Sequence, residues 1–278
     1  MHAVFRAGAL ALGEAAARKC LAEAGLEPRD VDYVVATTCT GYLCPGLSPR
    51  LAQALGMRDD VQRADLVGMG CAGAMPSLQR ASDFVRANQG RRALVVTVEV
   101  SSACWYVDDS LETVVGNTIC ADGAAAVVVG CDDGASGPRL ECFSTLLDFD
   151  FIESVGFEFK GGKNRIVLAK QLRTASGPLV RRAVERLLAQ AALDFTDVDH
   201  WIVHSGGKRV LDAIGDALDL RDGGLAHSRA VLRDFGNMSS PTLLFVLDRV
   251  LDLARSGDVG VLVALGPGLA AETGVLRW

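Results

Sequence analysis

The chain has 278 residues, 50% of them hydrophobic, and a formal net charge of -6. That length and composition suffice for a substantial apolar core, built as one large domain or as two fused halves. The acidic balance leaves no basic surface for nucleic acid, and no apolar stretch reaches the length of a bilayer span, so neither partner is expected. The first residues show no signal-peptide pattern, and we expect a cytoplasmic protein whose eight cysteines are reduced. The absence of a CxxC pair gives no support for a metal site.

Strand-like and helix-like segments alternate along the first half of the chain. The spacing of alanine and leucine predicts a helix over residues 9–24, and the β-branched run at 33–36 predicts a short strand. Residues 132–138 predict a surface turn because Asp, Gly and Pro gather there. The other elements expected in this half are a helix over Leu47–Leu55, a strand before Cys71, a helix over 76–87, and strands over 93–98, 124–129 and 140–145.

A similar order begins again in the second half. Its expected elements are helices over 177–192, 208–218 and 240–253, and strands over 201–203 and 259–264. Such alternation favours parallel or mixed sheets flanked by helices, which is an α/β fold.

Cys71 lies in the most informative segment, Asp-Leu-Val-Gly-Met-Gly-Cys-Ala-Gly-Ala-Met. A strand-like run there leads through small residues into a helix-compatible stretch, so the sulfur would lie over the positive end of a helix, which lowers the pKa of a thiol. Two later segments supply partners, Trp-Ile-Val-His-Ser-Gly-Gly with His204 and Asp-Phe-Gly-Asn-Met-Ser-Ser-Pro with Asn237. Alone, each residue type is more often structural, as a small buried cysteine, a histidine on a carbonyl or a helix-capping asparagine. Together they indicate a Cys-His-Asn site.

In this order and in these contexts, the three residues resemble those of the type III polyketide synthases, the chalcone synthase-like branch of the thiolase superfamily. Further matches are Gly-Asn-Met-Ser-Ser around Asn237, Ala-Asp-Gly-Ala-Ala-Ala at 121–126 and Gly-Pro-Gly-Leu at 266–269. The context of Cys71 is closer to bacterial members, such as the dihydroxyphenylacetyl-CoA synthases, than to plant chalcone synthases. The resemblance implies a thiolase-like α/β fold of duplicated βαβ halves in layered α/β/α/β/α packing. We expect residues 1–146 to carry the nucleophile and residues 147–278 to carry the histidine and asparagine.

The resemblance also implies an acyltransferase, a homodimer that extends an acyl-CoA starter with malonyl-CoA. Cys71 would hold the growing chain as a thioester, and His204 would pair with the thiolate as imidazolium and later donate to the enolate oxygen. Asn237 would polarise the malonyl carbonyl. Decarboxylation generates the carbanion in place, so the chemistry requires no strong base, cofactor, phosphopantetheine arm or metal beyond the CoA thioesters themselves.

Residues around the reaction cavity can be assigned from the same resemblance. Cys120 and Ile166 would occupy gate positions that usually carry phenylalanine, and their smaller size would widen the opening or change the choice of starter. Cys44 would lie on the loop that reaches into the neighbouring subunit's cavity, or would simply be a turn cysteine before proline. Other cavity positions are Ser101, Cys104, Gly116 and Ser239, for which ordinary packing is the alternative. Lys208 and Arg209 would meet CoA phosphates at the tunnel mouth, or form a solvated basic pair.

Family members carry a further N-terminal segment before the helix expected near residue 9, with early strands and basic residues that contact CoA. We therefore expect the first sheet of this chain to lack a strand and its CoA binding to be weak. Two alternatives to polyketide synthesis stay open, a single-condensation enzyme like ketoacyl synthase III and a non-catalytic dimerising remnant.

Overall fold

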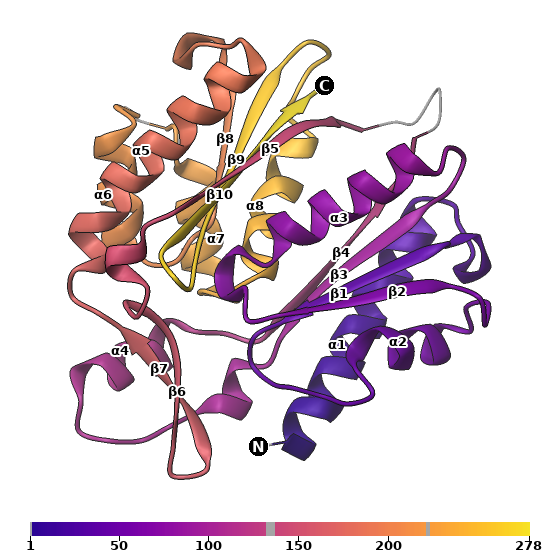
Figure 1. The fold of residues 1–278 in the computed structure, drawn as a ribbon, viewed down its shortest axis with the longest axis horizontal. Coiled ribbons are helices and arrows are strands. Elements are labelled where there is room, and N and C mark those ends of the chain that lie inside the picture. Colours follow the sequence, from indigo (N-terminus) through magenta and orange to yellow (C-terminus); the bar gives the residue numbers. More distant parts are fainter. Residues whose placement is uncertain (1, 132–136, 221–222) are drawn as a thin grey trace.

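Residues 2–131, 137–220 and 223–278 are described by the computed structural model. Most of the predicted turn at 132–138 lies outside the described residues. Figure 1 shows two stacked α/β units, with a small hairpin below them and the N-terminal helix at the bottom of the view.

Two four-stranded sheets organise the described residues. In the first, of order β2-β1-β3-β4, only β4 runs antiparallel to its neighbour. In the second, of order β5-β10-β9-β8, β8 and β9 are parallel and the other neighbours antiparallel. The strands are β1 (Tyr33–Thr38), β2 (Gln62–Val67), β3 (Ala93–Glu99), β4 (Gly123–Val129), β5 (Arg139–Leu147), β8 (His200–Val203), β9 (Val259–Gly266) and β10 (Ala270–Arg277). Strand β5 belongs to the second sheet, whereas the predicted boundary at residue 146 assigns it to the N-terminal half.

Helices form three layers around these sheets. Helices α1 (His2–Glu23) and α2 (Leu47–Leu55) cover the outer face of the first sheet, and α5 (Leu172–Ala191) and α6 (Lys208–Ala217) cover the outer face of the second. Helices α3 (Ala74–Ala87) and α8 (Pro241–Leu251) lie between the sheets and contact both (Figure 1). This order of layers confirms the predicted α/β/α/β/α packing.

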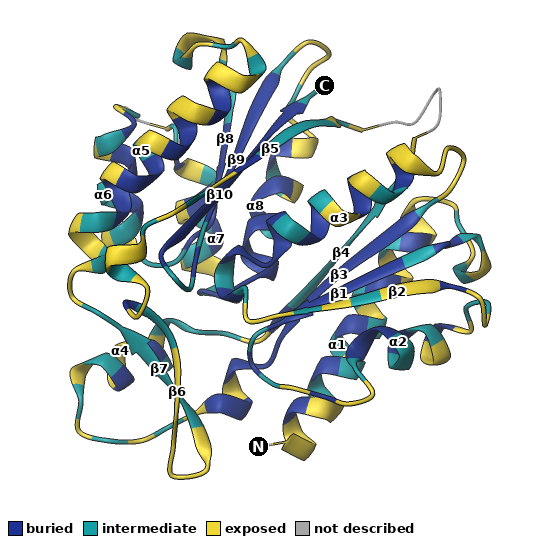
Figure 2. Ribbon diagram, in the orientation of Figure 1, coloured by how far each residue is buried: buried dark blue, intermediate teal, exposed yellow. Residues whose placement is uncertain are grey.

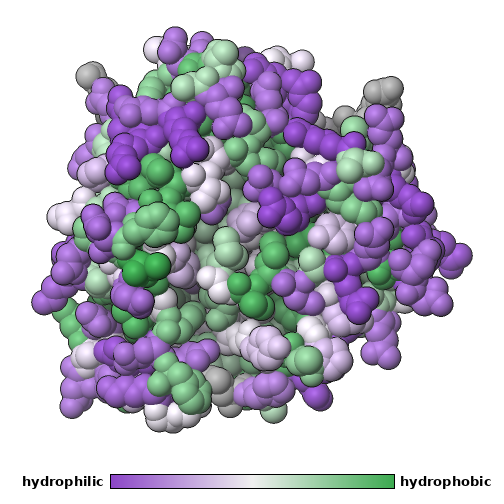
Figure 3. Space-filling model, viewed as in Figure 1, coloured by the Kyte–Doolittle hydropathy of each residue, from purple (hydrophilic) through white to green (hydrophobic). Residues whose placement is uncertain are grey.

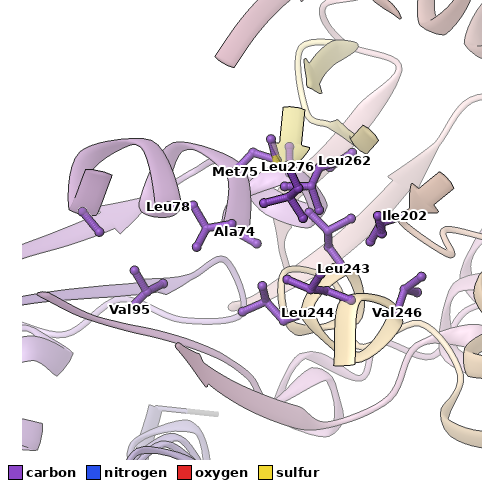
Figure 4. Close-up of a cluster of buried hydrophobic side chains, with 14 of the residues drawn as sticks. Ala74, Met75, Leu78, Val95, Ile202, Leu243, Leu244, Val246, Leu262 and Leu276 are labelled. Atoms are coloured by element: carbon purple, nitrogen blue, oxygen red, sulfur yellow. The ribbon is translucent and has the colours of Figure 1, made fainter. Parts of the chain in front are cut away.

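The central core explains why α3 and α8 lie inside. Met75 and Leu78 of α3 meet Leu243 of α8 and Leu262 of β9 in one buried cluster (Figure 4). Strand β3 is buried along its whole length, as expected of a strand with helices on both faces (Figure 2). The edge strand β2, in contrast, is largely exposed.

Several elements were not predicted or have bounds other than those predicted. Helix α1 begins at His2, seven residues before the predicted start, and buries Phe5. Helices α4 (Leu111–Ile119) and α7 (Ala226–Phe235) and strand β10 were missed. So was the hairpin of β6 (Val155–Lys160) and β7 (Lys163–Leu168), whose Gly161 and Gly162 both have positive φ, as a type I′ turn requires.

Candidate active site

Cys71, His204 and Asn237 line one pocket, which we call the Cys71 pocket. Cys71 lies in the short turn Gly70–Ala72 between β2 and α3, His204 directly follows β8, and Asn237 lies between α7 and α8. The pocket holds about 520 Å³ not filled by protein, part of it open to solvent. The structure thus brings Cys71 together with two residues more than a hundred positions further along the chain, and the roles of all three stay predictions.

The turn that carries Cys71 packs closely against the loop after β9. Gly70 has a φ of 50°, and a side-chain carbon there would overlap with Pro267. A carbon on Gly266 would lie 2.7 Å from the Cβ of Ala72. The Gly-Pro-Gly-Leu run therefore allows the second half of the chain to pack closely against the turn that carries Cys71. This close packing explains why glycine is needed in the motif.

Asn237 is held by hydrogen bonds at both its backbone and its amide. Its N–H donates to the carbonyl of Ile119 at 2.7 Å, and its own carbonyl accepts from Ala121 at 2.9 Å, which pairs it with Cys120. Its Oδ1 accepts from the N–H of Ser239 at 2.8 Å, and Nδ2 donates to the carbonyl of Gly206 at 3.2 Å. Because an amide nitrogen carries two hydrogens, one N–H is left for a group in the pocket.

Burial acts against the charged forms expected for Cys71 and His204. Burial raises the pKa of the Cys71 thiol, although hydrogen bonds from Ser239 and Asn237 act in the opposite direction. Burial lowers the pKa of His204 to about 4, and neither ring nitrogen has a hydrogen-bond partner among the described residues. Both effects follow from the cost of a charge in a site poor in water. Burial therefore favours a neutral thiol and a neutral imidazole over the expected thiolate–imidazolium pair, whose formation during the reaction stays a prediction.

A pH effect on stability follows from the burial of His204. Its pKa is 6.5 in the unfolded chain and about 4 in the folded one, so between these values only the unfolded chain binds the proton. Stability should therefore fall as the pH falls through this window, by roughly 2 kcal/mol between pH 7 and pH 5 from this group. Urea unfolding of the wild type and of His204→Gln at both pH values measures this. An equal loss in both proteins would show that His204 does not titrate as described.

A second pocket, which we call the Cys120 pocket, gathers most of the predicted cavity residues. It holds about 310 Å³ not filled by protein, open solvent included. Its lining includes Ser101, Cys104, Gly116, Cys120 and Ile166, together with Thr40, Trp105, Asn117 and Phe157. Cys120, in the lining of this pocket, is paired through its backbone with Asn237 of the Cys71 pocket.

One face of the β6–β7 hairpin contributes to both pockets. Val155 is paired with Leu168, and both line the Cys71 pocket. Phe157 is paired with Ile166, and both line the Cys120 pocket. Residues two apart on a strand point the same way, so the hairpin forms a common wall. Of the residues in this wall only Ile166 was predicted from the sequence. The alternation Phe-Glu-Phe-Lys at 157–160 is nevertheless typical of a strand.

The remaining predicted site residues line neither pocket. Ser239 lies beside them, since its Oγ is 3.4 Å from the Sγ of Cys39 and its N–H holds Asn237. Cys44 is exposed, in the loop before α2. Lys208 and Arg209 are exposed in the first turn of α6, where Lys208 donates to Asp212 at 2.8 Å. The next residue, Val210, does line the Cys71 pocket.

Glu99 is a buried carboxyl that the sequence analysis overlooked at the end of β3. Its Oε2 accepts from the N–H groups of Cys39 and Thr40 at 2.9 and 3.1 Å, and its Oε1 accepts from Ser240 at 2.7 Å. It thus joins the loop after β1 to the start of α8, next to Ser239. Its charge also adds to burial in raising the pKa of Cys104 to about 11 and of Cys120 to about 12. These cysteines are therefore thiols at neutral pH.

The described residues contain neither a membrane-spanning helix nor a metal-binding cluster. Among their helices none combines the length and the apolar content that a membrane crossing requires. Their side chains form no group of three or more His, Cys, Asp or Glu that could hold a metal ion.

Two stacked α/β halves with a cysteine, a histidine and an asparagine in one pocket define a thiolase-like protein. Models of the chalcone and stilbene synthases match the chain twice, the N-terminal domain over residues 1–133 and the C-terminal domain over residues 151–278. The chain belongs to the chalcone and stilbene synthase family. This confirms the predicted resemblance.

Curated relatives include bacterial enzymes that make polyketides. The 3,5-dihydroxyphenylacetyl-CoA synthase of Amycolatopsis orientalis is 34% identical over 275 residues, which cover 97% of this chain and 74% of the relative. The 1,3,6,8-tetrahydroxynaphthalene synthase of Streptomyces peucetius subsp. caesius is 37% identical over 275 residues, which cover 97% of this chain and 73% of the relative.

Two solved structures superimpose closely on this chain. PKS-I of the brown alga Ectocarpus siliculosus superimposes with a TM-score of 0.91 at 33% identity, covering 97% of this chain and 74% of that one. The type III polyketide synthase 1,3,6,8-tetrahydroxynaphthalene synthase of Streptomyces coelicolor gives a TM-score of 0.90 at 29% identity, covering 95% of this chain and 76% of that one. The predicted fold and the predicted class, an acyltransferase of the type III polyketide synthases, are both confirmed.

Proposed function

We propose that this chain decarboxylates malonyl-CoA and condenses the resulting enolate with an acyl group held as a thioester on Cys71. The observation that supports this most is the meeting of Cys71, His204 and Asn237 in one pocket of a chain of this family. In the first step, neutral His204 accepts the thiol proton and the sulfur attacks the thioester carbonyl of the starter. The carbon–sulfur bond to CoA then breaks, and the imidazolium returns the proton to the CoA thiolate.

In the second step, the N–H of Asn237 that is not bonded to Gly206 and a ring N–H of neutral His204 donate to the thioester oxygen of malonyl-CoA. Carbon dioxide leaves, and the electron pair of the broken bond forms an enolate whose oxygen these donors stabilise. The enolate carbon attacks the acyl carbonyl, and the sulfur of Cys71 leaves, so that the extended chain is carried by CoA. His204 suits this step, because its buried ring nitrogens form no hydrogen bond with any residue that the structure describes.

Substrate contacts beyond the three residues belong to the same proposal. We assign the Cys120 pocket to the acyl chain, with Cys120 and Ile166 at its gate and Ser101, Cys104 and Gly116 in its wall. Ser239 lies beside the reacting sulfur. Lys208 and Arg209 immediately precede Val210, which lines the Cys71 pocket, and we assign them to CoA phosphates, for which Lys208 must release Asp212. The protein would work without cofactor or metal, in the cytoplasm, as a homodimer in which Cys44 approaches the partner's cavity.

Incubation of the purified chain with malonyl-CoA and a panel of acyl-CoA starters tests the function, with products identified by mass spectrometry. We expect products extended by two or more malonyl units. A single extension with every starter would instead favour an enzyme like ketoacyl synthase III. Absence of both condensation and malonyl-CoA decarboxylation would refute catalysis by this chain.

The gate assignment predicts the outcome of Cys120→Phe. Phenylalanine adds bulk where Cys120 meets Gly116 and Ile166 in the pocket lining, so long or branched starters should be lost before short ones. One methylene in an apolar pocket changes specificity by roughly 10- to 200-fold, so we expect a loss of at least about tenfold for the largest starters. Competition between short and long acyl-CoA starters measures it, with Cys20→Phe on the remote helix α1 as a control. An unchanged product profile would show that Cys120 does not border the acyl chain.

A further inference from the structure

We propose that Arg165 is a specificity-determining positioning residue that clamps the β6–β7 hairpin onto the start of α4 and thereby sets the width of the Cys120 pocket. The clamp is a property of the fold, and its effect on substrate choice rests on the proposed function of that pocket. Arg165 does not itself line the pocket, so it acts through the hairpin.

Arg165 is surrounded by acceptors. Its side chain is only 11% exposed. Nε donates to Oδ2 of Asp108 at 3.0 Å, and Nη2 donates to Oγ of Ser110 at 2.9 Å. Nη1 lies 3.4 Å from Glu158, the residue paired with Arg165 across the hairpin, and Nη2 lies 3.7 Å from Glu112. Exposed ion pairs contribute little to stability, but a guanidinium shielded from water and bound to several acceptors forms a directional network of hydrogen bonds.

Two of the acceptors of Arg165, Asp108 and Ser110, belong to the cap of α4. Ser110 is the N-cap residue, and its Oγ accepts from the N–H of Thr113 at 3.2 Å. Asp108 in turn accepts from the N–H and the hydroxyl of Ser110 at 3.0 and 2.7 Å. Hydrogen bonds from Ser110, then Thr113 and Arg165, hold the pKa of Asp108 well below its ordinary value, so the clamp is ionised at any working pH. Arg165 is thus joined to the origin of the helix that carries Gly116 and leads into Cys120.

The neighbouring residue makes the second contact of the clamp. Ile166 lies on the opposite face of β7, and a side-chain carbon on Gly116 would overlap with its Cγ2. The hairpin therefore meets α4 at two successive residues, by an ionic contact at the cap and by an apolar contact inside the pocket. Because Phe157 is paired with Ile166, a shift of the hairpin moves two walls of the pocket together.

Apolar side chains next to the clamp are exposed to solvent. Phe159 near the hairpin tip and Leu111 at the start of α4 are exposed. Apolar residues gather in the middle of the face shown in Figure 3, and hydrophilic residues cover most of its margins. An ionic contact can fix a wall without adding apolar surface to the pocket, so its removal should loosen the wall rather than unfold the core.

Kinetics of Arg165→Gln and Arg165→Lys test the proposal, with hexanoyl-, octanoyl- and dodecanoyl-CoA as starters. We expect Arg165→Gln to change the ratio of kcat/KM for long over short starters by roughly tenfold in favour of the long ones, mainly through KM. Arg165→Lys should retain part of the wild-type ratio. The matched control is Arg277→Gln. It removes an arginine of β10 whose Nε donates a hydrogen bond to Glu141 of the neighbouring strand β5 at 3.1 Å. An unchanged ratio, or a uniform loss with all three starters, would overturn the proposal.

Two further measurements separate the clamp from the proposed function. Asp108→Asn keeps the shape of the cap and removes the charge, and it should shift the ratio in the same direction by less than Arg165→Gln. Hydrogen exchange should become faster over residues 155–168 in Arg165→Gln and stay unchanged there in Arg277→Gln, whether or not the chain is active. If exchange becomes faster in Arg165→Gln but the wild-type chain catalyses no condensation, only the proposed function is refuted. Unchanged exchange in Arg165→Gln would refute the clamp.

Discussion

Replacement of Cys71 by alanine is expected to abolish polyketide formation while the fold is retained. The change removes one sulfur atom from a partly exposed position in a turn, so the central core between the sheets is untouched. It removes the only nucleophile that shares a pocket with His204 among the residues lining it. Loss of the nucleophile of an acyl-enzyme can lower the rate by on the order of a millionfold, which would leave no detectable product.

Product formation by mass spectrometry and circular dichroism of the same samples measure both parts of this result. Cys20→Ala is the matched control, because Cys20 is also half-buried but lies on α1, away from both pockets. Full activity of Cys71→Ala would refute the assigned nucleophile, and equal losses in the two variants would point to a general effect on folding.

The second large effect is expected from Asn237→Ala. The variant loses one of the two donors to the developing enolate oxygen. Such a loss typically raises the activation free energy by about 3–4 kcal/mol, which lowers the rate roughly a hundred- to thousandfold. The loss should fall on malonyl-CoA decarboxylation and spare the loading of the starter on Cys71. His204→Ala should impair both steps, because the imidazole deprotonates the thiol and also donates to the enolate.

Carbon dioxide release from malonyl-CoA and intact-protein mass after exposure to a starter separate the two steps. Asn237→Asp adds a useful comparison, since it preserves the acceptor for the N–H of Ser239 but removes the N–H donor. Normal decarboxylation by Asn237→Ala would remove the role given to this residue.

The meeting of the three pocket residues could be predicted because each lies in a recognisable local context at the end of a strand or the start of a helix. Cys71 follows β2 of the first sheet and His204 follows β8 of the second, so their common pocket was implied by the family resemblance of their motifs and not by strand order within one sheet. The buried strands β3 and β9 could also be predicted, since uninterrupted runs of Val, Leu and Ala indicate strands that are covered on both faces.

The charge states of the site could not be predicted in the same way. Position at a helix start lowers the pKa of a thiol, but the burial of Cys71 and His204 is produced by segments distant in sequence, such as β9 and the hairpin, and it dominates here. Glu99 was missed for a related reason, because its donors are assembled from the loop after β1 and the start of α8. The wall formed by Phe157 and Ile166 depends on a Gly-Gly turn whose signal was present but not used.

The most direct test of the account is the location of the acyl group after the chain is exposed to an acyl-CoA starter without malonyl-CoA. Intact-protein mass spectrometry gives the number of acyl groups, and peptide mapping gives their positions. Cys104 and Cys120 have pKa values near 11 and 12 and are thiols at neutral pH, whereas Cys71 shares its pocket with a neutral histidine. The account predicts one acyl group per chain, on Cys71, which disappears in Cys71→Ala and is greatly reduced in His204→Ala. Acyl groups spread evenly over Cys39, Cys71, Cys104 and Cys120 would contradict it.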